Sequence, residues 1–340
     1  MRFKASIQNI NTFNKFTASI ASLGAVAWVR LDENEIRFTI IPEQGTQVWA
    51  VLAKDTIFEQ YTIQSANNDV INLEVPVVQL QRALKSALNA TSANIRLTKK
   101  DSLPVLCLTI NTVSYRTGVD AFGASSARQD PDAMDDRASS VDFNSSSRER
   151  ETIVTQDIPV RVLSQSNVDG IHEPRCREPD VHIQLPPLIQ LKSISDRFTK
   201  LALASKSGTS GNSNSTPRLE LSANMHGCLR LSIRTDAMNI STLWTGLQNP
   251  DLDPAQVEGG EEGIRHHAST RMRELGSADG KSEEGWATVR IDGRDWGKVM
   301  SVGRLSGRVI ACFCDDHALI LYVFLSNNED SDDPSVLTVS

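Results

Sequence analysis

The side chains best suited to chemistry are lysines and arginines that recur along predicted helices. Arg82 and Lys85 stand three positions apart in the segment VPVVQLQRALKSALNATSANIRL, and no acidic residue lies between Glu74 and Asp101. Residues with this spacing are neighbours on one helix face, so the pair would present fixed positive charge. Such charge attracts anionic partners, although a basic helix face is also a common solvated surface.

Catalytic and metal-binding chemistry has weaker support. The sequence contains no G-x-x-x-x-G-K-[ST] phosphate loop, no H-E-x-x-H zinc motif and no G-x-S-x-G nucleophile elbow. His266 and His267 lack a framework of carboxylates or thiols, and Cys312 and Cys314 favour a hydrophobic hairpin over a metal site. We therefore predict a non-enzymatic protein with no catalytic residue, no metal ligand and no cofactor. A Mg²⁺-dependent nuclease would instead need acids clustered on ordered strands, whereas these acids concentrate in loops and the tail.

The composition indicates a globular protein with more than one domain. The chain has 340 residues, of which 39% are hydrophobic and 23% charged, and its net charge is -7. This charge argues against a uniformly basic nucleic-acid binder but allows a local basic surface on an acidic body. The five cysteines are scattered, which indicates a reducing compartment, and no apolar run of about 18 residues is present to span a bilayer. We expect a soluble intracellular protein that does not bind membranes.

Hydrophobic periodicity predicts the elements that position the basic pair. Val77, Leu80 and Leu84 recur at helical spacing, so Arg82 and Lys85 would lie on a helix whose other face is buried. A Phe-rich helix is predicted after the first strand and ends near residue 24. Alternating apolar residues predict strands at 2–7, 25–31, 35–41, 46–52, 58–64, 70–75, 94–98, 105–113 and 152–163.

The same order of elements recurs in the second half of the chain. A long helix is predicted at 187–205, and Asp292 can cap a second helix that carries Trp296 and Val299. Strands are predicted at 181–185, 218–223, 228–234, 238–246, 286–291, 308–314 and 318–325. Every one of the four predicted helices carries basic residues off its apolar face, which favours one shared cationic surface. The candidates are Lys15, Arg82, Lys85, Lys192, Arg197, Lys200, Arg294, Lys298 and Arg304.

Changes in composition divide the chain into two domains. The predicted boundaries are an N-terminal domain at 1–163, a Gly- and Pro-containing connector at 164–180 and a C-terminal domain at 181–326. Polar, aliphatic-poor stretches predict a disordered insertion at 118–151, flexible insertions at 207–216 and 249–284, and a disordered acidic tail at 327–340.

Several separated segments of the chain resemble those of a known protein family. The runs LQRALKSALNATSANIRLTKK, TQDIPVRVL and EPDVHIQLPPLIQLKSISDRF, together with the opening MRFKASI, resemble the Hus-type subunit of the heterotrimeric, PCNA-like clamp of the DNA-damage checkpoint. The likeness covers most of the chain, and the insertions would make it a fungal-type member. The resemblance implies an α+β DNA clamp fold: two similar domains, each built from two βαβββ repeats, with outer sheets and inner helices.

The resemblance also implies partners and sites. Three subunits would form a ring around double-stranded DNA, in the nucleus, with two Rad-type subunits, a clamp loader, and repair and checkpoint proteins as partners. The nine basic residues above would face DNA without reading its sequence, and the connector would cover an outer groove for partner peptides. Two edge strands would form the subunit interfaces by β-augmentation. Their candidate residues are Thr152, Ile153, Val154, Ile158, Val160, Met238, Ile240 and Leu243.

Two alternatives to this function stay open. A replicative, PCNA-type processivity clamp would have the same fold, although the insertions and the quoted segments disfavour it. A protein scaffold that never contacts DNA would explain the basic helix faces as solvated surface. Binding to DNA at low and at high salt distinguishes a scaffold from a clamp.

Overall fold

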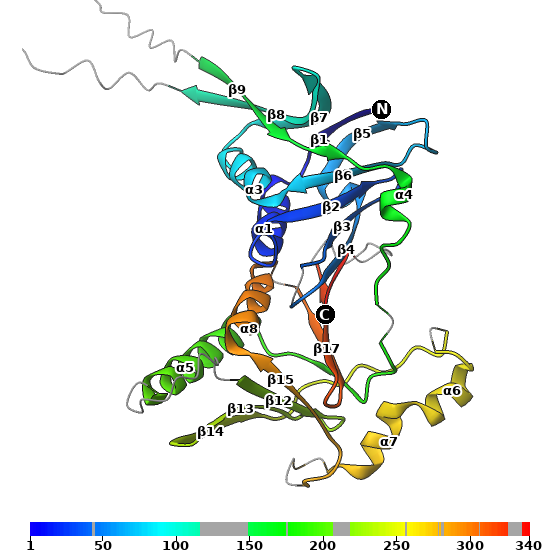
Figure 1. Ribbon diagram of the computed structural model, residues 1–340, viewed down its shortest axis with the longest axis vertical. Helices are drawn as coiled ribbons and strands as arrows, with labels where there is room; N and C mark the ends of the chain where they lie inside the picture. The colour runs from blue at the N-terminus through cyan, green and yellow to red at the C-terminus, as the bar shows by residue number, and fades with distance from the viewer. Residues whose placement is uncertain are drawn as a thin grey trace, which may run out of the picture.

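The computed structural model describes residues 1–42, 45–115, 149–174, 176–206, 218–255, 257–277, 279, 282–305, 307–325 and 335–340 (Figure 1). The predicted insertion at 118–151, apart from its last residues, and the whole of that at 207–216 lie outside these residues. The first half contains β1 (Arg2–Ile7), α1 (Ile10–Ile20), β2 (Val26–Leu31), β3 (Glu35–Ile40), β4 (Val48–Ala53), α2 (Lys54–Ile57), β5 (Phe58–Gln64), β6 (Ile71–Pro76), α3 (Val77–Ser86), β7 (Ser92–Lys100), β8 (Leu103–Tyr115), β9 (Glu149–Pro159) and β10 (Arg161–Val162).

The second half begins with a short helix in the connector. Its elements are α4 (Gln165–Val168), β11 (Val181–Gln184), α5 (Leu188–Lys206), β12 (Arg218–Asn224), β13 (Leu229–Thr235), β14 (Met238–Trp244), α6 (Gly260–His266), α7 (Ala268–Leu275), β15 (Trp286–Asp292), α8 (Gly293–Val299), the 3₁₀ helix η1 (Met300–Leu305), β16 (Val309–Cys314), β17 (Ala318–Phe324) and β18 (Val336–Val339). No helix among the described residues is long and apolar enough to cross a membrane.

A unit of strand, helix and three strands occurs four times, as the family resemblance implied. The units are β1-α1-β2-β3-β4, β6-α3-β7-β8-β9, β11-α5-β12-β13-β14 and β15-α8-β16-β17-β18. Local signals start the helices: the Asn9 side chain accepts a hydrogen bond from the Thr12 amide, and the Asp292 side chain accepts one from the Arg294 amide. The remaining elements are additions to this fourfold plan.

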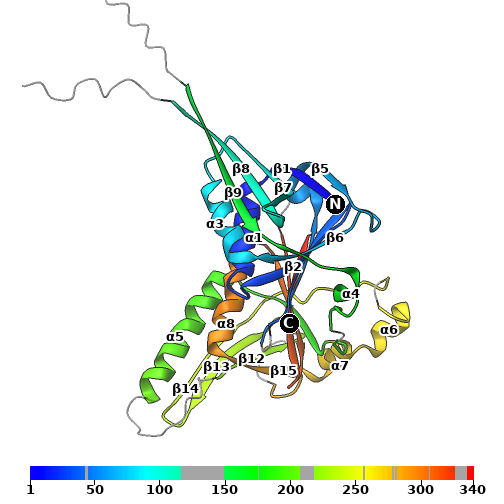
Figure 2. The same ribbon diagram turned by 45° about the horizontal axis from the view of Figure 1, so that its top comes forward.

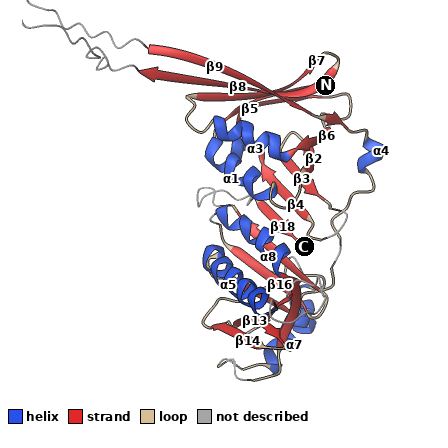
Figure 3. Cartoon of the chain, turned by 60° about the vertical axis from the view of Figure 1, so that its left-hand side comes forward, coloured by secondary structure: helices blue, strands red, loops and turns tan. Residues whose placement is uncertain are grey.

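Three antiparallel sheets form the outer layer. A nine-stranded sheet, in the order β10-β6-β2-β3-β4-β18-β17-β16-β11, runs through both halves of the chain. A five-stranded sheet, β5-β1-β7-β8-β9, lies at one end of the molecule, and a four-stranded sheet, β14-β13-β12-β15, lies at the other (Figure 3). The strands β4 and β18 pair in antiparallel register, with Ala50 opposite Leu337, and thereby join the two halves.

The helices α3, α1, α8 and α5 lie in one row on the same side of the sheets (Figure 1, Figure 3). In this row α1 contacts α3 on one side and η1 on the other, and η1 contacts α5. Buried aromatic rings hold α1 in place, since Phe16 packs edge-on against Phe38 and Phe13 packs edge-on against Phe58. The apolar faces of the helices and the inner faces of the sheets thus form the core.

Four predictions about local structure were wrong. The predicted disordered tail is ordered at 335–340, where β18 completes the fourth unit. The predicted flexible insertion at 249–284 contains α6 and α7, and Asn249 fixes its start by donating hydrogen bonds to the carbonyls of His182 and Asn224. The predicted strand at 152–163 is divided at Pro159 into β9 and β10, which belong to different sheets. The predicted end of the insertion at residue 151 is wrong, because β9 begins at Glu149.

Candidate nucleic-acid and subunit interfaces

The helix row positions all nine candidate cations on one layer of the molecule. On α3, burial of Val77, Leu80 and Leu84 turns Arg82 and Lys85 away from the core, and both are exposed. Of the remaining candidates, Lys15, Arg197, Lys200, Arg294, Lys298 and Arg304 are exposed and Lys192 is half-buried. In the described part of the chain, no ion pair involves Lys15, Arg82, Lys85, Arg197, Lys200, Arg294 or Arg304.

Three of the candidates also bind within the protein. The Lys192 ammonium lies 3.3 Å from an Asp196 carboxylate oxygen and donates to the Gly297 carbonyl at 3.2 Å, which ties α5 to α8. Lys298 donates to Asp295 at 2.9 Å. Arg304 donates to the Ala18 carbonyl at 3.4 Å, across the junction between η1 and α1. These contacts reduce the charge that Lys192 and Lys298 offer to an external anion.

Two of the edge strands, β9 and β14, lie at opposite ends of the molecule. The strand β9 is one edge of the five-stranded sheet and β14 is one edge of the four-stranded sheet, so within the described part of the chain each has one row of backbone groups that pairs with no other strand. Apolar side chains are exposed beside them: Ile153 is 63% and Val154 41% exposed on β9, and Leu243 is 46% exposed on β14. An exposed, apolar strand edge is a template for pairing with another chain.

The helices next to these edges add to the apolar surface. Leu88, just beyond α3, is 40% exposed, and Leu201 on α5 is 47% exposed. The helix α3 contacts β9, where Gln156 donates to Ser86 at 2.7 Å, and α5 contacts β14. Figure 2 shows α5 running alongside β13 and β14. Each free edge is thus flanked by one helix of the row.

The structure divides the predicted interface residues into two groups. Thr152, Ile153, Val154 and Leu243 are exposed, while Met238 and Ile240 are half-buried and pack against the core. Ile158 and Val160 are 2% and 8% exposed, so their side chains belong to the core and cannot contact a neighbouring subunit. The alternating sequence pattern of this strand did not indicate which of its two sets of alternate side chains faces the core.

A cavity of about 360 Å³ lies between the connector and the outer face of the nine-stranded sheet. Trp28 and Trp49 line its floor, and Ile171 and Glu173 of the connector line its wall. Burial raises the pKa of the Glu173 carboxyl. These half-buried tryptophans were not among the predicted site residues, although Trp28 shares its strand phase with the polar Arg30, which was a usable signal.

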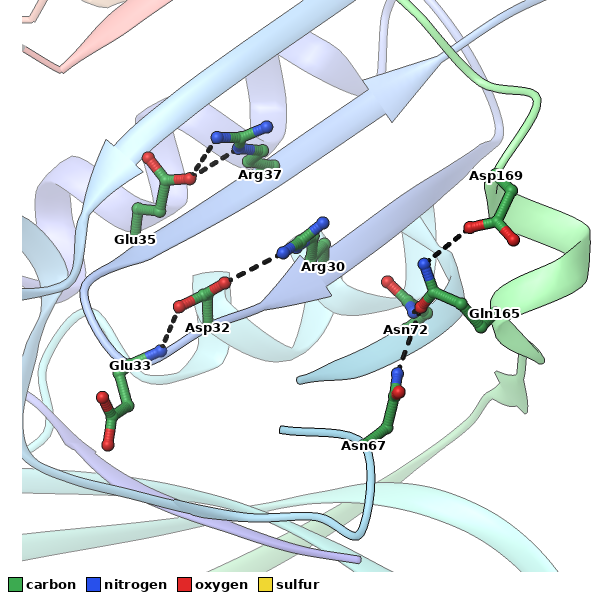
Figure 4. Close-up of polar contacts among 9 residues, drawn as sticks. All are labelled: Arg30, Asp32, Glu33, Glu35, Arg37, Asn67, Asn72, Gln165 and Asp169. Atoms are coloured by element: carbon green, nitrogen blue, oxygen red, sulfur yellow. Dashed lines mark hydrogen bonds and ion pairs between the residues drawn. The ribbon is translucent and has the colours of Figure 1, made fainter. Parts of the chain in front are cut away.

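Polar contacts hold the connector against the sheet. In Figure 4, Gln165 of α4 accepts hydrogen bonds from Asn67 at 3.1 Å and Asn72 at 3.4 Å, and it donates to Asp169 at 2.7 Å. Within the same view, Arg30 pairs with Asp32 at 3.1 Å. These contacts leave a formed groove whose floor is aromatic and whose rim is charged.

The described residues contain no cluster of three or more histidine, cysteine, aspartate or glutamate side chains that could hold a metal ion. Burial raises the pKa of the Cys312 thiol to about 12 and also raises that of Cys314, which is the behaviour of packed core thiols. The arrangement is therefore suited to binding, through cationic helices, free strand edges and the groove under the connector.

Comparison with known proteins agrees with this architecture. Solved structures with the same fold include PCNA from Thermococcus kodakaraensis, with a TM-score of 0.59 and 12% identity over 99% of this chain and 98% of that one. PCNA from Entamoeba histolytica has a TM-score of 0.54 and 11% identity over 99% of this chain and 96% of that one. These similarities confirm the predicted α+β, PCNA-like clamp fold.

The sequence comparisons identify the family within this fold. The chain is 38% identical to "Checkpoint protein hus1" of Schizosaccharomyces pombe over 97% of its own length and 95% of that protein. It is 28% identical to "Checkpoint protein HUS1" of Homo sapiens over 74% of its own length and 76% of that protein. The family model described as "Hus1-like protein" matches residues 1–338. The resemblance of the separated sequence segments is thereby confirmed, and the chain belongs to the Hus1-like protein family.

Proposed function

We propose that this chain is one subunit of a heterotrimeric ring clamp that encircles duplex DNA and acts in the DNA-damage checkpoint. The observation that carries the proposal is the single helix row backed by a sheet layer whose two ends are free strand edges. The relatives named as checkpoint proteins support the checkpoint role over replicative processivity. The ring would work in the nucleus, where a clamp loader places it on DNA and repair and checkpoint proteins bind it.

The internal joint provides the template for ring closure. Each unit ends in a third strand, and those of the first and fourth units, β4 and β18, pair with each other in antiparallel register. The third strands of the other two units, β9 and β14, are edge strands at opposite ends of the molecule. Pairing β9 and β14 with edge strands of two different Rad-type subunits would repeat the internal joint twice more. Each subunit would contribute two clamp domains, 1–163 and 181–340, joined by the connector at 164–180.

The helix row would then line the hole. Arg82, Lys85 and the other candidate cations would contact phosphates, which positions the clamp without reading base sequence. Binding of this kind is salt-dependent and permits sliding, because counterions are released and rebound along the duplex. The acidic remainder of the chain, with a net charge of -7 overall, would keep DNA off the other surfaces.

Co-expression with two Rad-type clamp subunits, followed by mass measurement, tests the assembly. We expect one copy of each chain in a closed complex, and retention of that complex on nicked circular DNA at low salt. A complex that forms but shows no retention at any salt concentration would favour the scaffold alternative. A homotrimer of this chain alone would favour the processivity alternative.

The groove under the connector supports a second binding role. Its aromatic floor at Trp28 and Trp49 and its pinned wall suit an extended segment of a repair or checkpoint protein. Deleting part of the connector should abolish partner binding while DNA loading persists. Loss of DNA loading before partner binding would contradict this role.

A further inference from the structure

A second cationic surface lies on the outer face of the five-stranded sheet. Phe3 and Ala5 of β1 and Ile95 of β7 are buried, so the alternating residues Arg2, Lys4 and Arg96 must point to the opposite face, and all three are exposed. Lys100 continues the same phase of β7. We call Arg2, Lys4, Arg96 and Lys100 the outer basic face.

The charges on the outer basic face are poorly compensated. Lys4 lies directly opposite Arg96 in the antiparallel pairing of β1 and β7. Like charges in directly opposed positions destabilise a sheet. Within the described residues, no ion pair involves Arg2, Lys4 or Arg96. A persistent repulsion of this kind indicates a use outside the isolated chain.

Two acids lie near this face, and they neutralise only part of its charge. Asp157 on β9 lies 2.7 Å from Lys100, and the hydrogen bond from Lys100 lowers the pKa of the Asp157 carboxyl. Glu59 stands at the far side, opposite Ser6. Asp157 is therefore ion-paired with Lys100 and also lies close enough to Arg96 for that charge to lower its pKa, whereas Lys4 has no ion-pair partner among the described residues.

The position of the outer basic face selects the kind of partner. It lies on the side of the sheet away from α1 and α3, so a duplex held against the helix row, as our proposed function requires, cannot reach it. The side chains between the cations are Thr62, Thr98 and Cys107, and they offer no aromatic ring on which nucleic-acid bases could stack. An anionic protein segment fits both observations.

We propose that the outer basic face binds an extended acidic peptide segment of a partner protein. Alternate residues along β1 or β7 are about 6.8 Å apart, which is also the spacing of alternate side chains in an extended peptide. Glutamate or aspartate side chains two positions apart would therefore meet Arg2 and Lys4 on β1, and side chains four positions apart would meet Arg96 and Lys100 on β7. The partner's carboxylates supply the negative charge that relieves the repulsion between Lys4 and Arg96.

The test measures peptide binding and stability in the same variants. A fluorescein-labelled peptide of alternating glutamate and serine is titrated by anisotropy against the full chain, assembled with its two partner subunits. We expect Lys4→Thr with Arg96→Thr to weaken binding at least tenfold and raised salt to weaken it further. Arg265→Thr with Arg271→Thr, exposed on α6 and α7, is the matched control and should bind as the wild type does.

The stability measurement separates a binding face from a structural one. Lys4→Thr alone should raise the melting temperature, because it removes the repulsion from Arg96, while it weakens peptide binding. A lower melting temperature would mean that the cations support the fold, which overturns the proposal. Equal peptide affinity in the double variant and the wild type also overturns it. Tighter binding of duplex or single-stranded DNA than of the peptide, abolished by the same double variant, would identify a nucleic-acid surface instead.

Discussion

Reversing both unpaired cations of α3 tests the helix row most directly. Arg82 and Lys85 are exposed, so Arg82→Glu with Lys85→Glu removes no ion pair within the described residues. We expect the free energy of unfolding to change by less than about 0.5 kcal/mol, the usual range for such surface substitutions. Ring assembly should be unaffected, because neither residue lies on β9 or β14.

The loss of DNA binding follows from counterion release. Each phosphate contact contributes about -0.9 to the slope of log K against log salt, so two lost contacts make the slope shallower by about 1.8. At about 0.1 M salt this corresponds to a binding constant lower by roughly 60-fold, before any repulsion from the new glutamates is counted. The assay is retention of the assembled ring on nicked circular DNA across a salt series.

The matched control places the same charge change away from the helix row. Arg265→Glu with Arg271→Glu alters two exposed arginines on α6 and α7, which lie apart from α3 and α1 (Figure 1). This control should keep the wild-type slope, because it removes only long-range attraction that salt screens. If the α3 variant assembles, yet keeps the wild-type slope and retention, the helix row does not hold DNA and the proposed function is wrong.

Three further predictions concern the joint between β4 and β18, the edge strands β9 and β14, and the buried His182 of β11. Leu337→Ala should lower the free energy of unfolding by about 3 kcal/mol in urea titrations, because Leu337 is fully buried between β17 and β4; a loss under about 1 kcal/mol would mean that β18 detaches readily. Ile153→Lys with Leu243→Lys should prevent ring assembly, measured by mass, yet leave the melting temperature of the isolated chain unchanged, since both side chains are largely exposed. Burial lowers the pKa of His182, so its folded pKa lies below the unfolded value of 6.5; stability should be complete above about pH 6.5 and fall as the pH drops through the folded pKa. The variant His182→Gln should lack this pH-dependent fall in urea titrations, and an identical pH profile in the two proteins would exclude His182 as its source.

Local patterns predicted the helices well because burial and spacing agree there. The helix α3 was predicted from Val77, Leu80 and Leu84, and the structure buries all three. Pro159 cannot donate to a sheet ladder, which is typical of an edge strand or a bulge, and β9 is indeed an edge of the five-stranded sheet. The sequence did not indicate that the chain changes sheets at this proline, because which sheet a strand joins depends on distant partners.

The strand β18 shows why the remaining errors arose. It has four residues and follows a run of acids, so neither its length nor its surroundings predict a strand. It is ordered because it pairs with β17 on one side and with β4 on the other, and these two strands are separated from one another by most of the chain. Leu201 shows a similar limit: its spacing predicts burial, but at this end of α5 it is 47% exposed. Candidate sites on helices were therefore more predictable than those that depend on how sheets meet.

The lengths of the paired strands support the distinction between internal and subunit joints. The joint between β4 and β18 has four residue pairs, and chain connectivity already holds its two sides close together. Association between separate chains must also offset the loss of translational and rotational freedom, about 4–15 kcal/mol, so it needs more contact. The free edges are longer, at 11 residues for β9 and 7 for β14, and apolar side chains flank both. At the internal joint the neighbouring helices meet instead through small polar groups, where Ser22 and Ser301 share a hydrogen bond. If β9 and β14 form the proposed subunit joints, the same unit would serve both kinds of joint, and the exposed apolar side chains beside these two strands would supply the additional contact that association between chains needs.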